Sequence, residues 1–437
     1  MKIDLHEYQS RRQALCRSIG ANGVLIVPSA TEKVRNRDCF YPFRQDSDFW
    51  YLTGFHEPEA LLVLAPGRQQ GETILFCRAN DRSREVWDGA RTGPDAAVDQ
   101  YAVDQAFAIT ELDTVMPGLL NGRKTLFHTA NRNRHLDQMV WGWIEALKQK
   151  EKSGAVAPGQ ISDREGLIHT ARMYKSAAEQ NMMRKAATIS MDAHRRAMQV
   201  CQPGMAEYQL EAALLHEFAE QGARFPAYSS IVAGGANSCT LHYCENSATL
   251  QDGDLVLIDA GCEYGHYASD ITRTFPVNGR FTGEQKALYE VVLKAQLAAI
   301  EQVAPKVPFD AFHKAALTTL VEGLIDLGLL AGDPHTLIEE KKFMPFFMHG
   351  TGHWLGLDVH DVGHHREQDK PILLQPGMAL TVEPGLYIAT DNTEVEERWR
   401  GLGIRIEDDL LVTESGCDVI TANLAKTVQD IEALMAS

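Results

Sequence analysis

The stretch His349-Gly-Thr-Gly-His353-Trp-Leu-Gly-Leu-Asp-Val-His360-Asp361 places three imidazole side chains within twelve residues. Two glycines separate the first two histidines, and the glutamate of an HExxH zinc-protease helix is missing. We therefore expect a glycine-rich loop that presents histidines beside exposed backbone. A lone histidine, such as the isolated His242, is usually a packed structural residue. The acidic residues on either side of the loop therefore decide what it does.

Two glutamates follow this loop, each at the end of an apolar run. Glu383 closes the run Ala-Leu-Thr-Val, and Glu407 lies in a segment that alternates as Ile-Arg-Ile-Glu. Period-2 alternation sends the two isoleucines to one face of a strand and Arg405 and Glu407 to the other. We expect Glu383 and Glu407 to line the same cleft. The alternative is that Arg405 simply neutralises Glu407 on a solvated face.

Two aspartates precede the loop. Asp259 ends the run Leu-Val-Leu-Ile, which has the composition of a buried strand. If Tyr264-Gly265 forms a two-residue hairpin turn, Asp259 faces Asp270 with Cβ atoms about 5 Å apart. Like charges so placed repel, so the pair either shares a proton or holds a cation. The alternative is two exposed hairpin acids, because Tyr-Gly is not an ideal turn pair and a bulge would break the pairing.

Together with one histidine, Asp259, Asp270, Glu383 and Glu407 would form an oxygen-rich site with four negative charges. Two divalent cations would neutralise these charges and leave room for a bridging hydroxide. Carboxylates with a single imidazole suit Mn²⁺, Co²⁺ or Mg²⁺ better than metals that prefer thiolates, and Zn²⁺ and Fe²⁺ remain open. A two-metal site of this kind polarises a carbonyl and activates water, so the sequence predicts hydrolysis.

Composition excludes several other classes of protein. The 437 residues exceed the roughly 250–300 at which single cores stop growing, so two domains are expected. The net charge of −17 would repel phosphate backbones and anionic lipids, so we expect neither nucleic acid nor membrane partners. Acidic residues near the start and the lack of an apolar run of about 18 residues predict a cytoplasmic protein. The 8 cysteines contain no CxxC pair and are expected to be reduced.

The charge is distributed unevenly along the chain. Residues 1–175 contain 23 Lys and Arg and 22 Asp and Glu, whereas residues 176–437 contain 19 and 37. A small-residue stretch at 153–159, a helix-like segment at 161–174 and the capping box Ser176-Ala-Ala-Glu179 lie near this change. We therefore predict an N-terminal domain at 1–175, including a linker helix, and a second domain at 176–437.

The two predicted domains differ in their patterns. In the first, apolar runs at 23–27, 61–64 and 73–76 alternate with helical patterns, which indicates an α/β fold without a nucleotide-binding glycine loop. The second is α+β. Its predicted helices lie at 177–200, 207–221, 283–303 and 310–329, and its predicted strands at 254–261, 266–275, 378–383 and 403–412. Segments 253–261 and 377–385 share a spacing of glycines and a carboxylate, which suggests two similar halves.

At these residues the sequence resembles the proline-peptidase group of the pita-bread metallopeptidases, which includes aminopeptidase P, prolidase, creatinase and methionine aminopeptidase. The resemblance rests on the loop 349–361 and on the order Asp, Asp, His, Glu, Glu. Segments 36–54 and 231–242 are similar to aminopeptidase P in particular. The resemblance implies a pita-bread catalytic domain with pseudo-twofold halves, preceded by an N-terminal domain of the creatinase and aminopeptidase P type. It implies the metal ligands Asp259, Asp270, His353, Glu383 and Glu407.

By the same resemblance, the protein removes the N-terminal residue from peptides that have proline second. Two divalent ions, with Mn²⁺ first among the candidates, would hold a bridging hydroxide that attacks the peptide carbonyl. The resemblance assigns hydrogen bonds to the carbonyl or oxyanion to His242 and His360, and proton transfer to Glu383. It assigns the lining of the proline pocket to His349, Tyr387 and Arg405. A homo-oligomer, either a dimer or a tetramer, is also implied.

Two alternatives remain open at this point. Prolidase has the same chemistry but prefers dipeptides, and it would need basic groups such as Arg366, Lys370 or Arg398 to engage the free carboxylate of the substrate. A non-catalytic, peptide-binding member of the fold would be expected to lose ligands, whereas this chain retains the complete set. Creatinase chemistry needs no metals and is disfavoured for the same reason.

Overall fold

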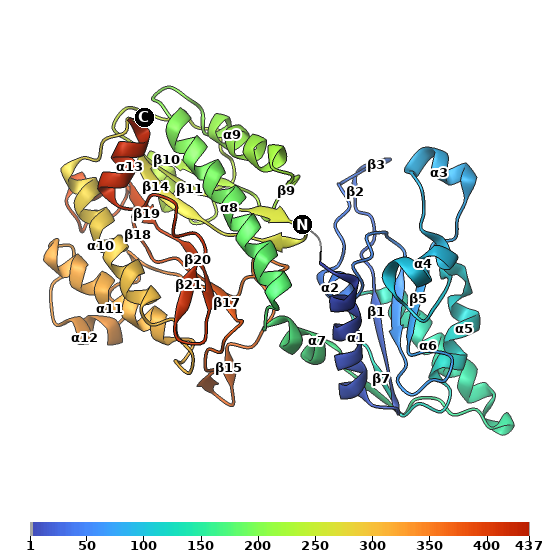
Figure 1. Ribbon diagram of the computed structural model, residues 1–437. Helices are drawn as coiled ribbons and strands as arrows, with labels where there is room; N and C mark the ends of the chain where they lie inside the picture. Colours follow the sequence, from blue (N-terminus) through green and yellow to red (C-terminus); the bar gives the residue numbers. More distant parts are fainter. Residues whose placement is uncertain (1–2, 437) are drawn as a thin grey trace. The chain divides into compact units, whose positions relative to one another are not determined.

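The computed structural model describes residues 3–436, which form two compact units that divide between Arg172 and Met173 (Figure 1). The boundary predicted at 175/176 lies just beyond this division. The small-residue stretch at 153–159 lies inside the first unit. No helix in the described part of the chain has both the length and the apolar content needed to span a bilayer.

The first unit is built around a mixed six-stranded sheet with the order β6-β5-β4-β1-β7-β8. Its strands are β1 (Gly23–Pro28), β4 (Leu61–Leu64), β5 (Thr73–Cys77), β6 (Gln105–Ala108), β7 (Thr125–Phe127) and β8 (Gln160–Ser162), with a separate pair β2 (Val34–Asn36) and β3 (Cys39–Phe40). Strands β1, β4 and β5 pair antiparallel, whereas β5–β6, β1–β7 and β7–β8 are parallel. The three apolar runs predicted as strands are confirmed.

Helices complete this unit. They are α1 (Leu5–Ile19), α2 (Ser47–Thr53), α3 (Arg82–Asp88), α4 (Gly93–Tyr101), α5 (Leu112–Leu120), α6 (Arg134–Gln149) and α7 (Glu165–Arg172). Side chains of α6 such as Val140 and Trp143 pack with Val24 and Ile26 of β1 in one apolar core. The helix expected over 161–174 is shorter in the structure, because β8 pairs with β7 and Asp163 then accepts the N–H of Glu165 at 3.0 Å.

The second unit contains three three-stranded sheets, β10-β11-β14, β13-β12-β9 and β17-β20-β21, and the strand pairs β15-β16 and β18-β19. Its strands are β9 (Phe225–Pro226), β10 (Ile231–Gly234), β11 (Leu255–Asp259), β12 (Cys262–Tyr264), β13 (Tyr267–Ala268), β14 (Thr272–Pro276), β15 (Arg366–Glu367), β16 (Lys370–Pro371), β17 (Ala379–Val382), β18 (Gly385–Ile388), β19 (Leu402–Arg405), β20 (Asp408–Val412) and β21 (Cys417–Val419). Its helices are α8 (Ala177–Val200), α9 (Glu207–Glu220), α10 (Gly283–Ile300), α11 (Ala311–Asp326), α12 (Pro334–Glu339) and α13 (Val428–Met435).

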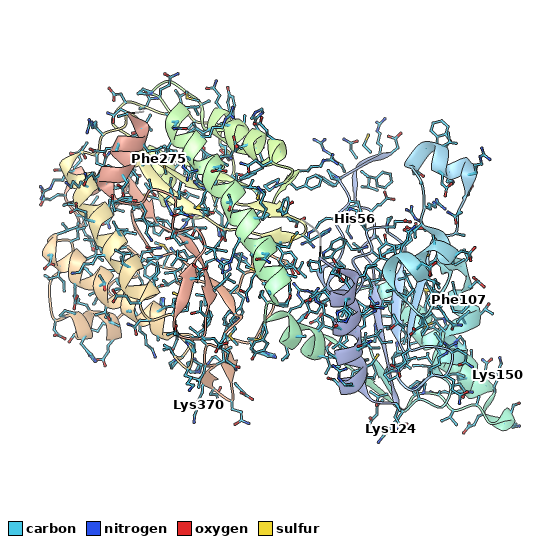
Figure 2. All side chains as sticks on the ribbon, viewed as in Figure 1. His56, Phe107, Lys124, Lys150, Phe275 and Lys370 are labelled. Carbon is cyan, nitrogen blue, oxygen red and sulfur yellow. The ribbon has the colours of Figure 1, made fainter. Side chains whose placement is uncertain are left out.

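Helix α8 begins and ends where the sequence predicted. The Ser176 hydroxyl accepts the N–H of Glu179 at 3.3 Å, and the Glu179 carboxylate accepts the N–H of Ser176 at 3.0 Å, which confirms the capping box. In Figure 1 strands β17 to β21 lie between α8 on one side and α10 and α11 on the other. Phe275 of β14 is fully buried (Figure 2).

The register predicted for the hairpin after Asp259 is wrong. Tyr264 pairs with Tyr267, so the turn is Gly265-His266, and both residues have positive φ angles of 57° and 73°. Positive φ at both central positions is typical of the turn that matches the twist of hairpin strands. Asp259 therefore pairs with Thr272 and not with Asp270, which lies in the segment between β13 and β14.

Two of the predicted strands are interrupted. The segment 266–275 divides into β13 and β14, and the segment 403–412 divides into β19 and β20. Strand β19 pairs with β18, whereas β20 pairs with β17, so the backbone changes partner at Ile406-Glu407. Each interruption places an acidic side chain where a ladder of regular pairing stops, which is where a side chain can be re-aimed.

Gly261 allows the backbone to cross closely between Asp259 and Asp270. A Cβ at this position would lie 1.7 Å from the carbonyl oxygen of Ser269. The same crossing is held by hydrogen bonds from the Ala260 N–H to the Ile271 carbonyl at 3.0 Å and from the Ser269 N–H to the Cys262 carbonyl at 3.1 Å.

We expect Gly261→Ala to lower the free energy of unfolding by about 1–3 kcal/mol, the usual cost of overpacking, because the new methyl group must displace backbone. Chemical denaturation measures the change. The control is Gly283→Ala at the start of α10, where a Cβ meets nothing within 4 Å. Equal stability of the two variants would contradict the close crossing.

Candidate active site

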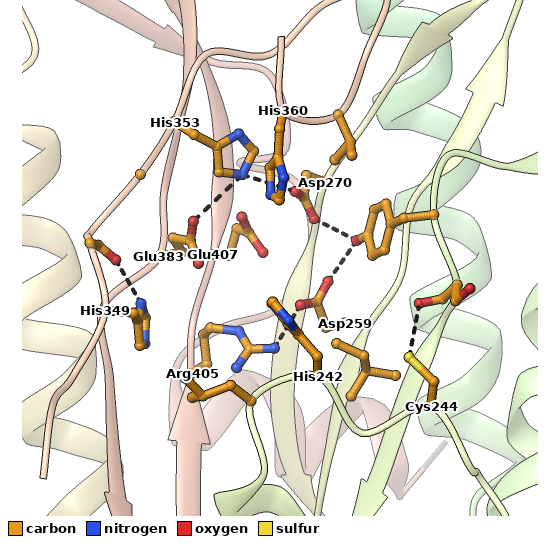
Figure 3. Close-up of a pocket in the computed structure, with 17 residues that line it drawn as sticks. His242, Cys244, Asp259, Asp270, His349, His353, His360, Glu383, Arg405 and Glu407 are labelled. Atoms are coloured by element: carbon orange, nitrogen blue, oxygen red, sulfur yellow. Dashed lines mark hydrogen bonds and ion pairs between the residues drawn. The ribbon is translucent and has the colours of Figure 1, made fainter. Parts of the chain in front are cut away.

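One pocket of the second unit collects the predicted site residues (Figure 3). Of that set, the residues that line it are His242, Asp259, Asp270, His349, His353, His360, Glu383, Arg405 and Glu407. Four of them lie at strand ends or breaks: Asp259 at the end of β11, Asp270 before β14, Glu383 after β17 and Glu407 between β19 and β20. The three loop histidines precede β17. Segments next to the sheets β10-β11-β14 and β17-β20-β21 therefore converge on one pocket.

The two aspartates meet even though they are not paired across strands. The Tyr228 hydroxyl lies 2.6 Å from Oδ1 of Asp259 and 2.5 Å from Oδ1 of Asp270. A phenol has only one proton to donate. It cannot satisfy both oxygens fully, so two carboxylates remain crowded around a single donor. Tyr228 was not predicted as a site residue, because it lies in the segment after β9 and belongs to no motif.

The orientation of His353 is fixed by the backbone. Its Nδ1 lies 2.9 Å from the Trp354 carbonyl oxygen, which can only accept, so Nδ1 carries the proton. The opposite nitrogen, Nε2, lies 3.3 Å from Oδ2 of Asp270 and 3.5 Å from Oε1 of Glu383. A neutral imidazole would direct its lone pair at two carboxylates. This arrangement is favourable only when a proton or a metal cation lies at Nε2.

The electrostatics of these groups follow from that crowding. Burial alone would lower the pKa of His353, but its hydrogen bond to Asp270 and the charges of Asp270 and Glu383 raise the pKa to about 9. Burial and the charge of Asp270 raise the pKa of Glu383 to about 7, and they raise the pKa of Glu407 well above its usual range. Burial also raises the pKa of Asp259. These groups therefore hold protons more tightly than usual, because few other positive charges lie near them.

Arg405 neutralises part of this negative charge. It pairs with Asp259 and not with Glu407, the partner considered from the sequence. Its Nη2 lies 2.6 Å from Oδ2 of Asp259, and its Nη1 donates to the Tyr387 hydroxyl at 3.0 Å. That hydroxyl lies 2.8 Å from Nε2 of His349. Tyr387 is 1% exposed and is not among the lining residues, so it contacts two of them from behind instead of lining the pocket itself as the resemblance implied.

Glu407 is held by a threonine that the sequence reasoning missed. The Thr272 hydroxyl donates to Oε2 of Glu407 at 2.7 Å and accepts a hydrogen bond from Nε of Arg405 at 3.1 Å. Thr272 is the cross-strand partner of Asp259. The correct hairpin register would have identified Thr272 as a neighbour of Asp259. The idea that Arg405 neutralises an exposed Glu407 does not hold, because Glu407 is 1% exposed and Arg405 pairs with Asp259.

A fifth acid lies behind the site and was also missed. Both carboxylate oxygens of Asp409 lie near the backbone nitrogen of Asp270, at 3.2 and 3.1 Å, so they accept its N–H. Asp409 is fully buried, and burial together with the charge of Asp270 raises its pKa well above the usual range. The consecutive acids after Ile406 were the available signal, because an acid within an apolar strand needs a partner.

The remaining two histidines are exposed at the edge of the pocket. The His360 ring lies 4.3 Å from the His353 ring, measured between centroids, at an interplanar angle of 81°. In the view of Figure 3 the carboxylates lie between His360 and His242. Burial and the neighbouring His353 lower the pKa of His360, which favours a neutral ring. Both histidines can therefore reach a molecule that lies over the carboxylates.

The donor set fits divalent cations. Asp270, His353 and Glu407 each offer one ligand atom, and these three atoms lie within 4.8 Å of one another. Asp259 and Glu383 flank this group, with side chains 13% and 18% exposed. Oxygen donors with one imidazole, oriented by a backbone carbonyl on its far nitrogen, are the arrangement that Mn²⁺, Co²⁺, Mg²⁺ or Zn²⁺ would accept.

We expect Thr272→Val to weaken metal binding by about 10- to 100-fold, the usual effect of removing a group that orients a ligand. Valine retains the shape but loses both hydrogen bonds of the hydroxyl. Titration of the metal-free protein with Mn²⁺ measures the affinity. Thr272→Ser keeps the hydroxyl and is expected to bind Mn²⁺ like the parent protein. Equal affinities in the valine and serine variants would show that Thr272 does not orient Glu407.

Comparisons with known proteins agree with this geometry. The model of metallopeptidase family M24 matches residues 181–414, and that of the aminopeptidase P N-terminal domain matches residues 8–127. The chain is 45% identical to the Xaa-Pro aminopeptidase of Escherichia coli over 100% of this chain and 99% of that protein. It is 35% identical to human Xaa-Pro aminopeptidase 3, covering 98% of this chain and 85% of that protein.

Solved structures show the same relationship. The structure of Pseudomonas aeruginosa aminopeptidase PepP is 51% identical and superposes with a TM-score of 0.98, covering 100% of this chain and 98% of that one. Zinc-substituted E. coli aminopeptidase P with bound product is 45% identical, with a TM-score of 0.97 and coverage of 100% and 99%. The predicted pita-bread catalytic domain with an aminopeptidase P type N-terminal domain is confirmed. The chain belongs to metallopeptidase family M24 and, within it, to the aminopeptidase P group.

Proposed function

We propose that this protein is a metal-dependent Xaa-Pro aminopeptidase, which releases the N-terminal residue from peptides that have proline in the second position. One observation carries the proposal. Four carboxylates and the Nε2 lone pair of His353 converge on one pocket, in a chain that matches Xaa-Pro aminopeptidases over its whole length.

Two divalent ions per subunit would be held by the five proposed ligands, which are Asp259, Asp270, His353, Glu383 and Glu407. Mn²⁺ is our first choice because the set consists of carboxylates and a single imidazole, and Co²⁺, Zn²⁺, Fe²⁺ and Mg²⁺ are compatible with it. Bound ions supply Lewis-acid activation of the scissile carbonyl and of the attacking water. The residues around them bind the peptide, hold its carbonyl and move protons.

The peptide bond to proline sets the requirements of the site. It is a tertiary amide without an N–H, so recognition must come from the ring and from the carbonyl. Ile231, Leu241 and Val359 provide apolar lining for a ring. We assign the proline pocket to His349 and Arg405, with the Tyr387 hydroxyl fixing the positions of both. The acidic lining attracts the positively charged amine at the start of the substrate.

Proton transfer is assigned to Glu383. The proline nitrogen must be protonated before it can leave, and a general acid or base works best when its pKa lies near the working pH. Without cations, burial and the charge of Asp270 raise the pKa of Glu383 to about 7, and bound cations would lower the pKa and favour the carboxylate that acts as a base. Its backbone is fixed by a hydrogen bond from its N–H to the Thr351 carbonyl at 2.8 Å. It can therefore take a proton from water and deliver it to the proline nitrogen.

His242 and His360 are assigned to the carbonyl oxygen. Negative charge develops there as the bond is attacked, and donors already in position stabilise it. A neutral imidazole has one N–H to donate, and the lowered pKa of His360 keeps its ring in that form. Both rings lie at the pocket edge, where a peptide over the carboxylates would present its carbonyl.

Prolidase is the second candidate, and the lining of the pocket argues against it. Prolidase must hold the carboxylate of a dipeptide with a free cationic group. Among the described lining residues Arg405 is the one arginine, no lysine is present, and Arg405 already pairs with Asp259 at 2.6 Å. Arg366, Lys370 and Arg398 do not line the pocket.

We further propose a cytoplasmic homo-oligomer without nucleic acid or membrane partners. The net charge of −17 supports the exclusion of anionic polymers and lipid surfaces. The N-terminal unit, which carries no part of the pocket, is the proposed means of association between subunits.

Purified protein loaded with Mn²⁺ is expected to hydrolyse an Xaa-Pro-Yaa tripeptide and not the matched Xaa-Ala-Yaa tripeptide. Chelation should abolish the reaction, and added Mn²⁺ should restore it. Asp270→Ala is expected to lose metal and activity together, because it removes a ligand; metal analysis and product chromatography measure both. Exclusive cleavage of the Xaa-Pro dipeptide would support prolidase instead.

Metal binding is expected to release protons. The pKa values of about 7 for Glu383 and about 9 for His353 are both raised, so the metal-free site retains protons near neutrality that the metal must displace. Apparent affinity therefore rises as the pH rises toward these values. Calorimetric titrations with Mn²⁺ in buffers of different ionisation enthalpy measure the protons released. Heats that do not depend on the buffer would contradict the proposed ligands.

A further inference from the structure

We propose that the buried ion pair between Lys175 and Asp361 positions His360, which makes Lys175 a positioning residue of a pocket that it does not line. The inference rests on the proposed function, in which His360 donates to the carbonyl oxygen. It concerns a lysine from the start of the second unit that neither the motifs nor the mechanism uses.

His360 has no anchor of its own. Its side chain is exposed, and its ring contacts the His353 ring at 4.3 Å between centroids. Within residues 3–436, no hydrogen bond to a protein group joins the His360 imidazole. A donor that acts on a developing charge must nevertheless be held in place before the reaction. The position of His360 therefore depends on the backbone that carries it.

Asp361 provides that anchor. Its N–H donates to the Trp354 carbonyl at 2.9 Å, which closes the loop 354–361 on itself. Its carboxylate turns inward, and Oδ2 lies 3.0 Å from Nζ of Lys175. The side chains of Lys175 and Asp361 are 2% and 1% exposed. Charges this deeply buried are tolerated when they are paired, so the pair strongly favours one position of the loop.

A glycine leaves room for the side chains of Lys175 and Asp361. At Gly356 a Cβ would lie 2.2 Å from Oδ2 of Asp361 and 3.0 Å from Cε of Lys175. The same glycine accepts the N–H of Ala268 on its carbonyl at 2.8 Å. Ala268 belongs to β13, directly before the segment that carries Asp270. The loop thus crosses over the ion pair and is tied to the strand that leads to the proposed metal site.

Lys175 is itself fixed at both ends of its backbone. Its N–H donates to the Gly377 carbonyl at 2.8 Å, and its carbonyl accepts from Nε2 of Gln180 at 3.0 Å. Ser176, the next residue, caps α8. The ammonium group therefore extends from a fixed origin toward Asp361.

Loss of the ammonium would remove the charge that Lys175 places beside the buried Asp361 carboxylate, and removal of one partner of a buried ion pair is strongly destabilising. The carboxylate would then turn toward water and carry the adjacent His360 with it. A displacement of about 1 Å in a catalytic group can lower the rate on the order of 100-fold. The proposed metal ligands remain in place, so metal content and KM should change little while kcat falls.

The test compares Lys175→Met, which retains the length of the side chain, with the milder Asp361→Asn and with His360→Ala. Turnover of an Xaa-Pro-Yaa peptide, bound Mn²⁺ and Tm are measured for each. We expect kcat of Lys175→Met to approach that of His360→Ala, and Lys175→Met/His360→Ala to be no slower than His360→Ala alone. Lys426→Met removes another lysine paired to a buried carboxylate, that of Asp408, at 2.7 Å. It is the control and should keep its kcat, because Arg273 still pairs with Asp408 at 2.8 Å.

A second comparison separates positioning from general stability. Lys175→Met/Asp361→Leu replaces the pair by apolar groups and should recover Tm, because such replacements are often neutral or stabilising. It should not recover kcat. Recovery of kcat together with Tm would overturn the inference, as would unchanged kcat in Asp361→Asn and Lys175→Met while His360→Ala is slow. Full activity of His360→Ala would instead overturn the role proposed for His360, and an inactive wild-type protein would overturn the proposed function.

Discussion

The repulsion between four carboxylates in one largely buried place is the constraint on which the rest of the site depends. Each neighbour supplies part of the missing positive charge or hydrogen bonding. Arg405 pairs with Asp259, the Tyr228 hydroxyl lies between the two aspartates, and Thr272 holds Glu407. These contacts do not balance four negative charges, and the raised pKa values show where charge is still lacking. The folded site therefore attracts cations, because they supply the positive charge that the surrounding protein groups lack.

The fold places the acids by interrupting strands. Regular pairing would alternate their side chains between faces and spread them along the sheets. Instead β11 gives way to a close crossing at Gly261, and the chain changes partner between β19 and β20. The sheets β10-β11-β14 and β17-β20-β21 contribute acids in similar ways, although β11 includes Asp259 and β17 ends before Glu383. Irregular backbone is therefore where the chemistry is concentrated, and regular strands provide its support.

Much of this could be predicted from the sequence, because local rules govern it. The capping box set the start of α8, and the apolar runs of the first unit marked its strands. The hairpin register could not be predicted, since the turn uses His266 at a positive φ, which is uncommon for residues other than glycine. Tyr228 and Thr272 belong to no motif, and their contacts arise when distant segments meet. The hidden position of Tyr387 likewise depends on the pairing of β18 with β19.

Three adjacent acids, Glu407, Asp408 and Asp409, lie in three different environments. Glu407 faces the pocket, Asp408 pairs with Arg273 and Lys426, and Asp409 accepts the N–H of Asp270. A shift of β20 by one residue would exchange these environments and leave charges buried beside the wrong neighbours. A slip by one residue turns every side chain to the other face of the sheet, and in β20 it would also separate each acid from its partner. An insertion or deletion in β20 would therefore leave buried acids without their partners. The register of this strand thus sets where each of the three acids lies in the site.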